Sequence, residues 1–393
     1  MLSRVRKHLT WRRFFKLTVL AHASGLLFAS AQAAPPDSGL DAIRTGAGDS
    51  GFAQVLEPRA FVFPQDHGPH PEYKHEWWYV TGHLDAKTGE RFGFELTFFR
   101  FALTPPTQSA SPWRTRQIYM AHFAITDLDR KQFHFAERYS RDALGLAGAT
   151  AEPFRVWLED WSLAAASPSA PQTWRLTASD PHYTFNLALQ PQTAPVLNGE
   201  AGLSRKSELP GSASYYFSIP RLHIQGQVIR DGVPLEVDGL AWLDREWGSG
   251  ALAPDQAGWD WYALQFDDGS ALMFYALRND DGTSHPYSAG TWIEADGRTR
   301  ALKHSDVSIE VLDKWSSPRG GTYPSRWRLR VPTLGLNIMV TPELADQELD
   351  TSPRYWEGAV KITGEKSGRA AGGRGYVELV GYSRPAAQTD TNK

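Results

Sequence analysis

Short stretches in which apolar and polar residues alternate run through most of the chain, and turn-forming residues separate them. A period of two residues is typical of β-strands that bury one face, and aromatic and β-branched residues are frequent in these stretches. No long amphipathic helix is evident, so the pattern predicts an all-β fold, a sandwich or a barrel. The predicted strands cover residues 78–84, 91–101, 118–128, 215–229, 259–266, 271–278 and 376–382.

Two segments repeat the same order of features. Residues 77–100 and 260–278 both run from Trp and Tyr through a strand and an acidic glycine turn into an apolar strand that ends in Arg. A weaker pair, 215–226 and 355–364, follows in the same order. Such a repeat predicts two related β-domains in tandem.

When the two segments are aligned by residue type, Trp-Trp-Tyr at 77–79 matches Asp-Trp-Tyr at 260–262. The predicted division is a signal peptide at 1–33, a flexible segment at 34–52, a first β-domain at 53–238, a second β-domain at 239–385 and a tail at 386–393.

The N-terminus has the composition of an export signal. A basic start, an apolar stretch and small residues suited to cleavage after Ala31 or Ala33 follow one another. Arg12 and Arg13 are typical of the twin-arginine route, and the general secretory (Sec) route is the alternative. The protein is therefore expected to be periplasmic or secreted.

Charge and cysteine content limit the kinds of partner and chemistry that the protein can have. The first 33 residues hold six Lys or Arg and no acid, which leaves 35 basic and 44 acidic residues and a net charge near −9 beyond them. This balance disfavours nucleic acid as a partner. The absence of cysteine excludes disulfides and thiolate chemistry. Four histidines within residues 67–83 fit no known zinc spacing, so no metal or cofactor is predicted.

The stretch Lys74 to Leu84 is the first candidate site. On a strand, side chains alternate between faces, so His75, Trp77, Tyr79 and His83 share one face and Glu76, Trp78, Val80 and Leu84 share the other. A carboxylate beside Trp and Val either pairs with a base or has a raised pKa. Glu76 is therefore either part of a structural ion pair or a general acid.

The run 239–250 is the second candidate. The side chains of Trp242, Asp244 and Glu246 are predicted on one face, and Arg245 can bind a carboxylate such as Glu76 or stack on a Trp. A structural charged network and a functional one both explain this run.

The run 258–266 is the third candidate. Trp259 and Trp261 are predicted on one face, and Asp260 and Tyr262 on the other, where carboxyl and phenol can contact one ligand or each other. His122 interrupts an apolar strand, which is typical of a buried, hydrogen-bonded histidine and less often of a pocket histidine.

Long motifs resemble the AttH family, secreted lipocalin-like proteins related to bacterial carotenoid 1,2-hydratase. The motifs that carry the likeness are HEWWYVTGHL, YMAHFAITD, PFRVWLEDW, GLSRK, ASYYFSIPRL, GLAWLDREWGS, GWDWYALQFDDG and YWEGAV, spread over about residues 53–385. The resemblance implies two tandem lipocalin-like β-barrels. The resemblance also implies one of two functions: partnership with an inner-membrane ABC transporter, or hydration of an isoprenoid C=C that is protonated by a carboxylic acid.

Three functions follow from these features. The favoured one is binding of a hydrophobic lipid or isoprenoid, the second is a hydro-lyase, and the third is a structural envelope protein. The candidate general acids are Glu76, Asp244 and Asp260. The candidate ligand-binding residues are His75, Trp77, Trp78, Tyr79, His122, Arg245, Glu246, Trp247, Trp259, Trp261 and Tyr262.

Overall fold

The computed structural model describes residues 51–106, 116–167, 170–250 and 252–382. The described residues belong to one compact unit, Asp37–Lys393. The predicted signal peptide, nearly all of the segment 34–52 and the tail 386–393 lie outside the described residues.

Helical structure in the described part is confined to three short 3-10 turns, and none of its helices is long and apolar enough to cross a membrane. The turns are η1 (Gln65–His67), η2 (His304–Asp306) and η3 (Pro332–Leu334).

The first sheet has thirteen strands in the described part, in the order β4-β3-β2-β1-β13-β12-β9-β8-β7-β6-β5, with β10 and β11 paired to β12. Neighbouring strands are antiparallel, as in the ladders of β1 with β2 and with β13. The strands are β1 (His75–Ala86), β2 (Arg91–Ala102), β3 (Gln117–Asp127), β4 (Gln132–Arg141), β5 (Ala147–Ala151), β6 (Phe154–Leu158), β7 (Trp161–Ser167), β8 (Ala170–Ser179), β9 (Tyr183–Pro191), β10 (Val196–Leu197), β11 (Leu203–Arg205), β12 (Ala213–Arg230) and β13 (Val233–Gly248).

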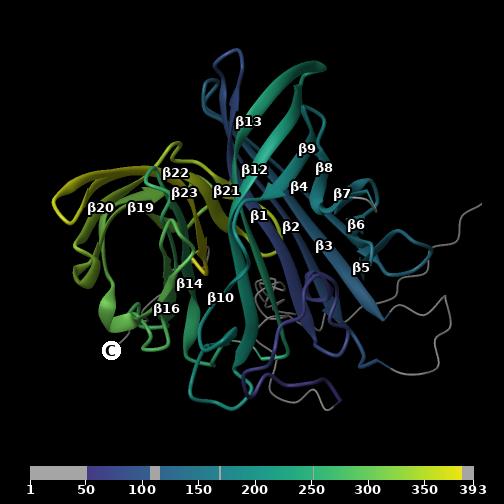
Figure 1. Ribbon diagram of the computed structural model, residues 1–393, viewed down its shortest axis with the longest axis horizontal. Coiled ribbons are helices and arrows are strands. Elements are labelled where there is room, and N and C mark those ends of the chain that lie inside the picture. The colour runs from purple at the N-terminus through teal and green to yellow at the C-terminus, as the bar shows by residue number, and fades with distance from the viewer. Residues whose placement is uncertain (1–50, 107–115, 168–169, 251, 383–393) are drawn as a thin grey trace, which may run out of the picture. The chain divides into compact units, whose positions relative to one another are not determined.

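The second sheet has ten strands in the same part of the chain, in the order β17-β16-β15-β14-β23-β22-β20-β19-β18, with β21 paired to β22. One sheet forms a nearly closed barrel and the other a half-barrel (Figure 1), which confirms the predicted all-β fold of two tandem lipocalin-like barrels. The strands are β14 (Gln256–Phe266), β15 (Ala271–Asn279), β16 (Ala289–Ile293), β17 (Thr299–Lys303), β18 (Ser308–Ser316), β19 (Thr322–Val331), β20 (Leu336–Pro342), β21 (Glu348–Leu349), β22 (Tyr355–Lys366) and β23 (Arg369–Val380).

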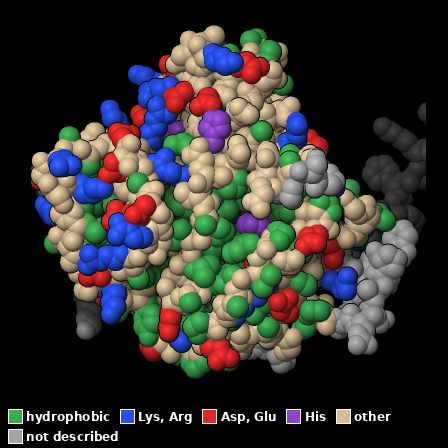
Figure 2. All heavy atoms as spheres, viewed as in Figure 1, with side chains coloured by type: hydrophobic (Ala, Val, Ile, Leu, Met, Phe, Trp, Pro, Cys, Tyr) green, Lys and Arg blue, Asp and Glu red, His purple; other side chains and the backbone are tan. Residues whose placement is uncertain are grey.

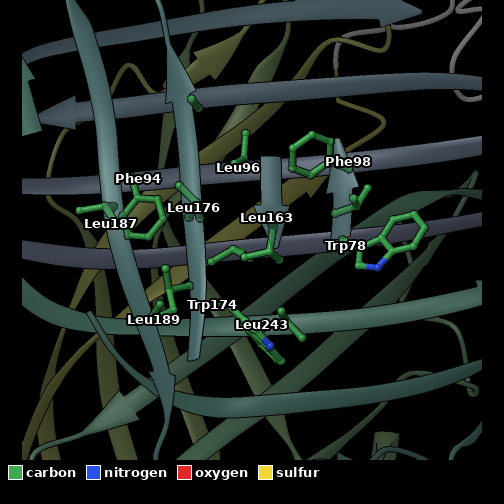
Figure 3. Close-up of a cluster of buried hydrophobic side chains, with 14 of the residues drawn as sticks. Trp78, Phe94, Leu96, Phe98, Leu163, Trp174, Leu176, Leu187, Leu189 and Leu243 are labelled. Carbon is green, nitrogen blue, oxygen red and sulfur yellow. The ribbon is translucent and has the colours of Figure 1, made fainter. Parts of the chain in front are cut away.

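The core of the first sheet lies between two layers of its own strands. Figure 3 shows Trp78 and Phe98, from β1 and β2, in one cluster with Leu163 of β7 and Leu176 of β8. These side chains are fully buried. Burial of each such side chain stabilises the fold by roughly 1.5–3 kcal/mol, so this packing fixes which face of β1 points inward.

The other face of β1 meets the second sheet. Tyr79 belongs to an apolar cluster that also contains Trp261 of β14 and Tyr376 of β23. The side chain of His83 contacts the backbone oxygen of Gly375 at 2.9 Å. Both faces of β1 are thus buried, one inside the first sheet and one against the second, and the alternation predicted for this stretch is confirmed.

The chain passes from the first sheet to the second between Gly248 and Gln256. The predicted division at 238/239 falls inside β13, which pairs along most of its length with β12 and, from Val237 to Gly248, with β1. The apolar run that begins at Gly239 resembles the start of a new domain, but it continues a strand already in the first sheet. On the face of the molecule in Figure 2, apolar side chains gather in the middle and charged side chains mainly towards the margins.

Candidate active site

The two sheets enclose a pocket whose wall combines aromatic rings with carboxyl groups. Its volume is about 110 Å³, close to the ~150 Å³ of a cavity that takes up a benzene ring. Such a pocket fits the end of a larger apolar molecule. Its main lining residues are His75, Trp77, Tyr79, Glu95, Thr97, Phe99, Lys206, Ser214, Tyr216, Asp244 and Glu246 from the first half, and Trp259, Trp261, Tyr275, Leu277 and Glu378 from the second.

Aromatic side chains from both sheets form the apolar part of the wall. Tyr79 lies edge-on to Trp261, with ring centres 5.0 Å apart and ring planes at 82°. The indole N–H of Trp261 donates to the hydroxyl of Tyr216 at 3.0 Å. The face of an aromatic ring attracts positive charge, so this wall suits an apolar ligand on which such charge develops.

Asp244 lies on β13 in a network of donors. Its Oδ1 accepts hydrogen bonds from Ser218 Oγ at 2.5 Å and from Trp242 Nε1 at 2.7 Å. Its Oδ2 accepts a hydrogen bond from the hydroxyl of Tyr216. Burial outweighs these donors and raises the pKa of Asp244 to about 7. The carboxyl can therefore take up or release a proton near neutral pH.

Glu378 lies opposite, on β23, and its side chain is only partly buried. Its Oε2 accepts a hydrogen bond from the indole N–H of Trp259 at 2.7 Å. Burial, with the negative charges of Glu246 and Asp244, raises the pKa of Glu378 to about 7. Among the described residues, Trp259 is the hydrogen-bond partner of Glu378, and Glu378 lines the pocket.

Two further carboxyl groups are fully buried: Glu95 lines the pocket, and Glu357 lies outside its lining. Burial raises the pKa of Glu95 to about 8, and the neighbouring Glu378 adds to the effect. Burial and the charges of Glu95 and Glu378 raise the pKa of Glu357 well above its ordinary value. The hydroxyl of Tyr79 donates to Glu357 Oε1 at 2.5 Å. In the described part of the chain, none of these carboxyl groups is paired with a Lys or Arg.

Lys206 supplies the cation of the wall. Its Nζ lies 3.1 Å from Glu246 Oε1 and 3.0 Å from Ser204 Oγ. Burial would lower the pKa of Lys206, but the Glu246 carboxylate outweighs burial and raises it. The hydroxyl of Ser204 lies 2.9 Å from that of Tyr275. This end of the pocket therefore offers both donors and acceptors to a polar group of a ligand.

Glu76 lies on the opposite face of β1, inside the first sheet and outside the pocket. Arg100 Nε donates to its Oε1, and Arg245 Nη2 donates to its Oε2 at 3.0 Å. The ring of His70 lies 3.2 Å from the same Oε2. Burial would raise the pKa of Glu76, but Arg100, His70 and Arg245 lower it well below its ordinary range. The geometry favours the structural ion pair over the general acid.

The other predicted residues divide between pocket and core. Trp78 and Trp247 lie in the core of the first sheet, and Tyr262 lies in the core of the second. Asp260 points to the same side as Tyr262, where Arg278 Nη1 donates to it at 2.7 Å. The predicted residues that line the pocket are His75, Trp77, Tyr79, Asp244, Glu246, Trp259 and Trp261, and those outside its lining are Glu76, Trp78, His122, Arg245, Trp247, Asp260 and Tyr262.

Sequence reasoning missed several residues of the site. Glu95, Glu357 and Glu378 each interrupt an apolar strand, in FELTFF, YWEGAV and YVELVG. This is the signal that singled out Glu76, so the same test applied along the whole chain finds all three. Lys206 had a weaker signal as a base in GLSRK, because its partner Glu246 is distant in sequence.

No group of three or more His, Asp or Glu among residues 51–106, 116–167, 170–250 and 252–382 is arranged to hold a metal ion.

Comparisons with known proteins place this site in context. A crystal structure of an AttH protein from Nitrosomonas europaea is 36% identical, with a TM-score of 0.75, and the match covers 85% of this chain and all of that one. Kievitone hydratase from Nectria haematococca shares the fold at 18% identity and a TM-score of 0.64, over 85% of this chain and 98% of its own.

Among curated proteins, the dehydratase AsqC of Emericella nidulans is 27% identical over 220 residues. That match spans 53% of this chain and 61% of the relative, so it covers less than two thirds of the relative's length. The model of the AttH-like family matches residues 54–382. The chain therefore belongs to the AttH-like family.

Proposed function

We propose that the protein is a hydro-lyase that adds water to, or removes water from, an apolar substrate whose end enters the pocket. The observation that carries the proposal is Glu378, a carboxyl group at an aromatic pocket wall that has no Lys or Arg partner among the described residues and whose pKa burial raises to about 7. An acid of this kind donates protons efficiently near neutral pH. The dehydratase among its sequence relatives supports the same reaction class.

In the hydration direction, Glu378 gives its proton to one carbon of a C=C, and the π electrons form the new C–H bond. The other carbon becomes positive, and the rings of Trp259 and Trp261 stabilise it. A water molecule adds to that carbon, and Asp244 accepts the proton that the water releases. The donors around Asp244 favour its carboxylate and suit it to the role of base. Dehydration follows the reverse path.

The test uses the purified chain with an acyclic carotenoid in ¹⁸O-labelled water, and mass spectrometry of the products. Wild type is expected to form a labelled alcohol. Glu378→Gln and Asp244→Asn are each expected to lower the rate by roughly 10²–10⁴-fold, the usual contribution of a general acid or base. Asp260→Asn is the matched control, because its carboxyl lies outside the pocket.

The proposal is overturned for this substrate class if wild type forms no labelled alcohol and removes no water from the corresponding alcohol. If the carotenoid is retained in native mass spectrometry but not converted, binding alone is the function. The aromatic wall supports that second candidate. In that case we propose a carrier in the periplasm that works beside an inner-membrane ABC transporter, and the export pattern at residues 1–33 motivates it.

A further inference from the structure

A chain of hydrogen-bonded side chains runs from the surface to Glu95 in the pocket wall. Glu137 Oε1 lies 3.1 Å from His122 Nε2. His122 Nδ1 lies 2.8 Å from the hydroxyl of Tyr355, and that hydroxyl lies 3.2 Å from Glu95 Oε1. The chain crosses from β4 and β3 of the first sheet to β22 of the second and returns to β2.

The two ends of this chain differ in their access to solvent. The side chain of Glu137 is 23% exposed, whereas Glu95 and His122 have no exposed surface. Phe99 lies edge-on to His122, with ring centres 5.3 Å apart. In the described part of the chain, the hydrogen-bond partners of Glu95 are Thr97 and Tyr355. The phenol of Tyr355 is thus the link between Glu95 and the surface.

The hydrogen-bond inventory of these groups permits two arrangements with the same number of protons. In the first, Glu95 is protonated and donates to Tyr355, Tyr355 donates to His122 Nδ1, and His122 Nε2–H donates to the Glu137 carboxylate. In the second, every hydrogen bond is reversed, so Glu137 holds the proton and Glu95 is ionised. Burial lowers the pKa of His122, so its ring stays neutral in both arrangements.

We propose that Glu137, His122 and Tyr355 form a proton relay between solvent and the carboxyl group of Glu95. In one shift, the proton of Glu95 moves to Tyr355, that of Tyr355 moves to His122 Nδ1, and that of His122 Nε2 moves to Glu137. Glu137 then releases its proton to water. When Glu137 takes up a proton from water, the reverse shift returns a proton to Glu95, so each full cycle exchanges one proton with solvent.

The role of the relay during the reaction rests on the proposed function. Glu95 has no solvent-exposed surface even in the ligand-free protein, and a ligand that fills the pocket would also keep water from the partly buried Glu378. Glu95, Glu357 and Glu378 influence one another's charge. A relay that carries protons through β3 and β4 resets the protonation of these three carboxyl groups while the pocket stays occupied. His122 and Tyr355 also join the two sheets, so the test must separate proton transfer from stability.

The test follows the infrared carbonyl band of Glu95 in the ligand-free protein after a rapid change from about pH 7 to about pH 9, which spans its pKa of about 8. The band is identified by its loss in Glu95→Gln. Tyr355→Phe and Glu137→Gln are each expected to slow its decay by roughly tenfold or more. Tyr323→Phe is the matched control, because it removes a buried phenol that donates to Glu348 at 2.7 Å.

The relay is overturned if the band decays at the wild-type rate in either variant, or if Glu95 shows no protonated band at neutral pH. Should Tyr355→Phe not fold, Glu137→Gln decides the outcome, since its side chain lies at the surface. A purely structural role of His122 and Tyr355 predicts lower stability with unchanged decay of the band. No substrate is used, so failure of the relay is distinct from failure of the hydro-lyase.

Discussion

The two faces of β1 each meet buried carboxyl groups, and the protein treats them in opposite ways. Behind Trp78, Glu76 lies between two arginines, which keep it ionised. Beyond Tyr79, the carboxyl groups of Glu357, Glu95 and Glu378 have no Lys or Arg partner in the described part of the chain, and burial raises the pKa of each.

The difference teaches that burial alone does not decide the charge of an acid. A nearby cation favours the carboxylate, whereas an apolar surrounding with a second carboxyl favours the acid form. An ionised, fully paired carboxylate holds a fold in place, and a neutral acid at a pocket can give up its proton. The location of the arginines therefore separates the structural face of β1 from the chemical one.

The largest expected effect comes from Glu76→Gln. Removal of this charge leaves Arg100 and Arg245 unbalanced in the core, and breaking a buried pair costs about 3–5 kcal/mol of stability. Denaturant unfolding measures it. Asp260→Asn is the control with a smaller expected loss, because the pair with Arg278 is partly exposed. A loss below about 1 kcal/mol for Glu76→Gln would show that the arginines do not need this carboxylate.

The second prediction concerns pH. Burial lowers the pKa of histidines such as His75 to about 4, and the unfolded chain loses most of its histidine protons near pH 6.5, so their opposing contribution is small above about pH 7. Above that pH, the folded state still holds protons on Asp244, Glu378 and Glu95 that the unfolded chain has lost. The free energy of unfolding should therefore fall by about 2 kcal/mol as pH rises from about 6.5 to about 8.

Chemical denaturation at a series of pH values checks this slope. The double variant Glu95→Gln, Glu378→Gln should flatten it, because amides do not titrate. A wild-type profile that is flat or rises over this range would mean that the carboxyl groups beyond Tyr79 are ionised in the folded protein.

The third prediction is that Glu357→Gln changes the stability of the fold in the direction opposite to Glu76→Gln. Glu357→Gln replaces a neutral acid by an amide of the same shape, which can still accept the hydrogen bond from Tyr79. We expect stability near that of wild type at about pH 5 and a gain at about pH 8, because there the unfolded chain is ionised at this position while burial opposes ionisation in the folded state. Destabilisation at both pH values, measured by the same denaturation, would place an ionised carboxylate at this position.

The smallest expected effect is that of Trp259→Phe. The change removes the N–H that donates to Glu378 Oε2 and keeps an aromatic ring. Because this donor favours the carboxylate, its loss should raise the pKa of Glu378 slightly and cost about 1 kcal/mol of stability. Infrared titration of the Glu378 band measures the shift, and a lowered pKa would contradict the assigned hydrogen bond.

Strand faces could be predicted from the sequence because alternation is a local property of the backbone. His75, Trp77 and Tyr79 face the second sheet, and Glu76 and Trp78 face the first core, as the pattern indicates. The all-β fold followed from the same signal. Strand pairing is not local, so the division at 238/239 falls inside β13.

The match of residue types between the two repeats does not hold by strand face. It aligns Trp78 with Trp261, but Trp78 lies in a core and Trp261 lines the pocket. Trp77 shares the pocket side with Trp261, and Glu76 and Asp260 both lie outside the pocket, each paired with an arginine of the following strand. The identity of an aromatic residue does not show which face of its strand it occupies. Glu95, Asp244 and Glu378 are distant in sequence, and the fold brings them to one pocket.

Infrared difference spectra at about pH 6 test most directly whether the acids on the two sides of β1 differ in protonation, with Glu378 protonated and Glu76 ionised. Wild type minus Glu378→Gln should show a protonated carboxyl band that disappears above about pH 8, whereas wild type minus Glu76→Gln should show only carboxylate throughout. A carboxylate band alone for Glu378 at about pH 6 would contradict the account, because the pocket would then hold no acid able to protonate a substrate.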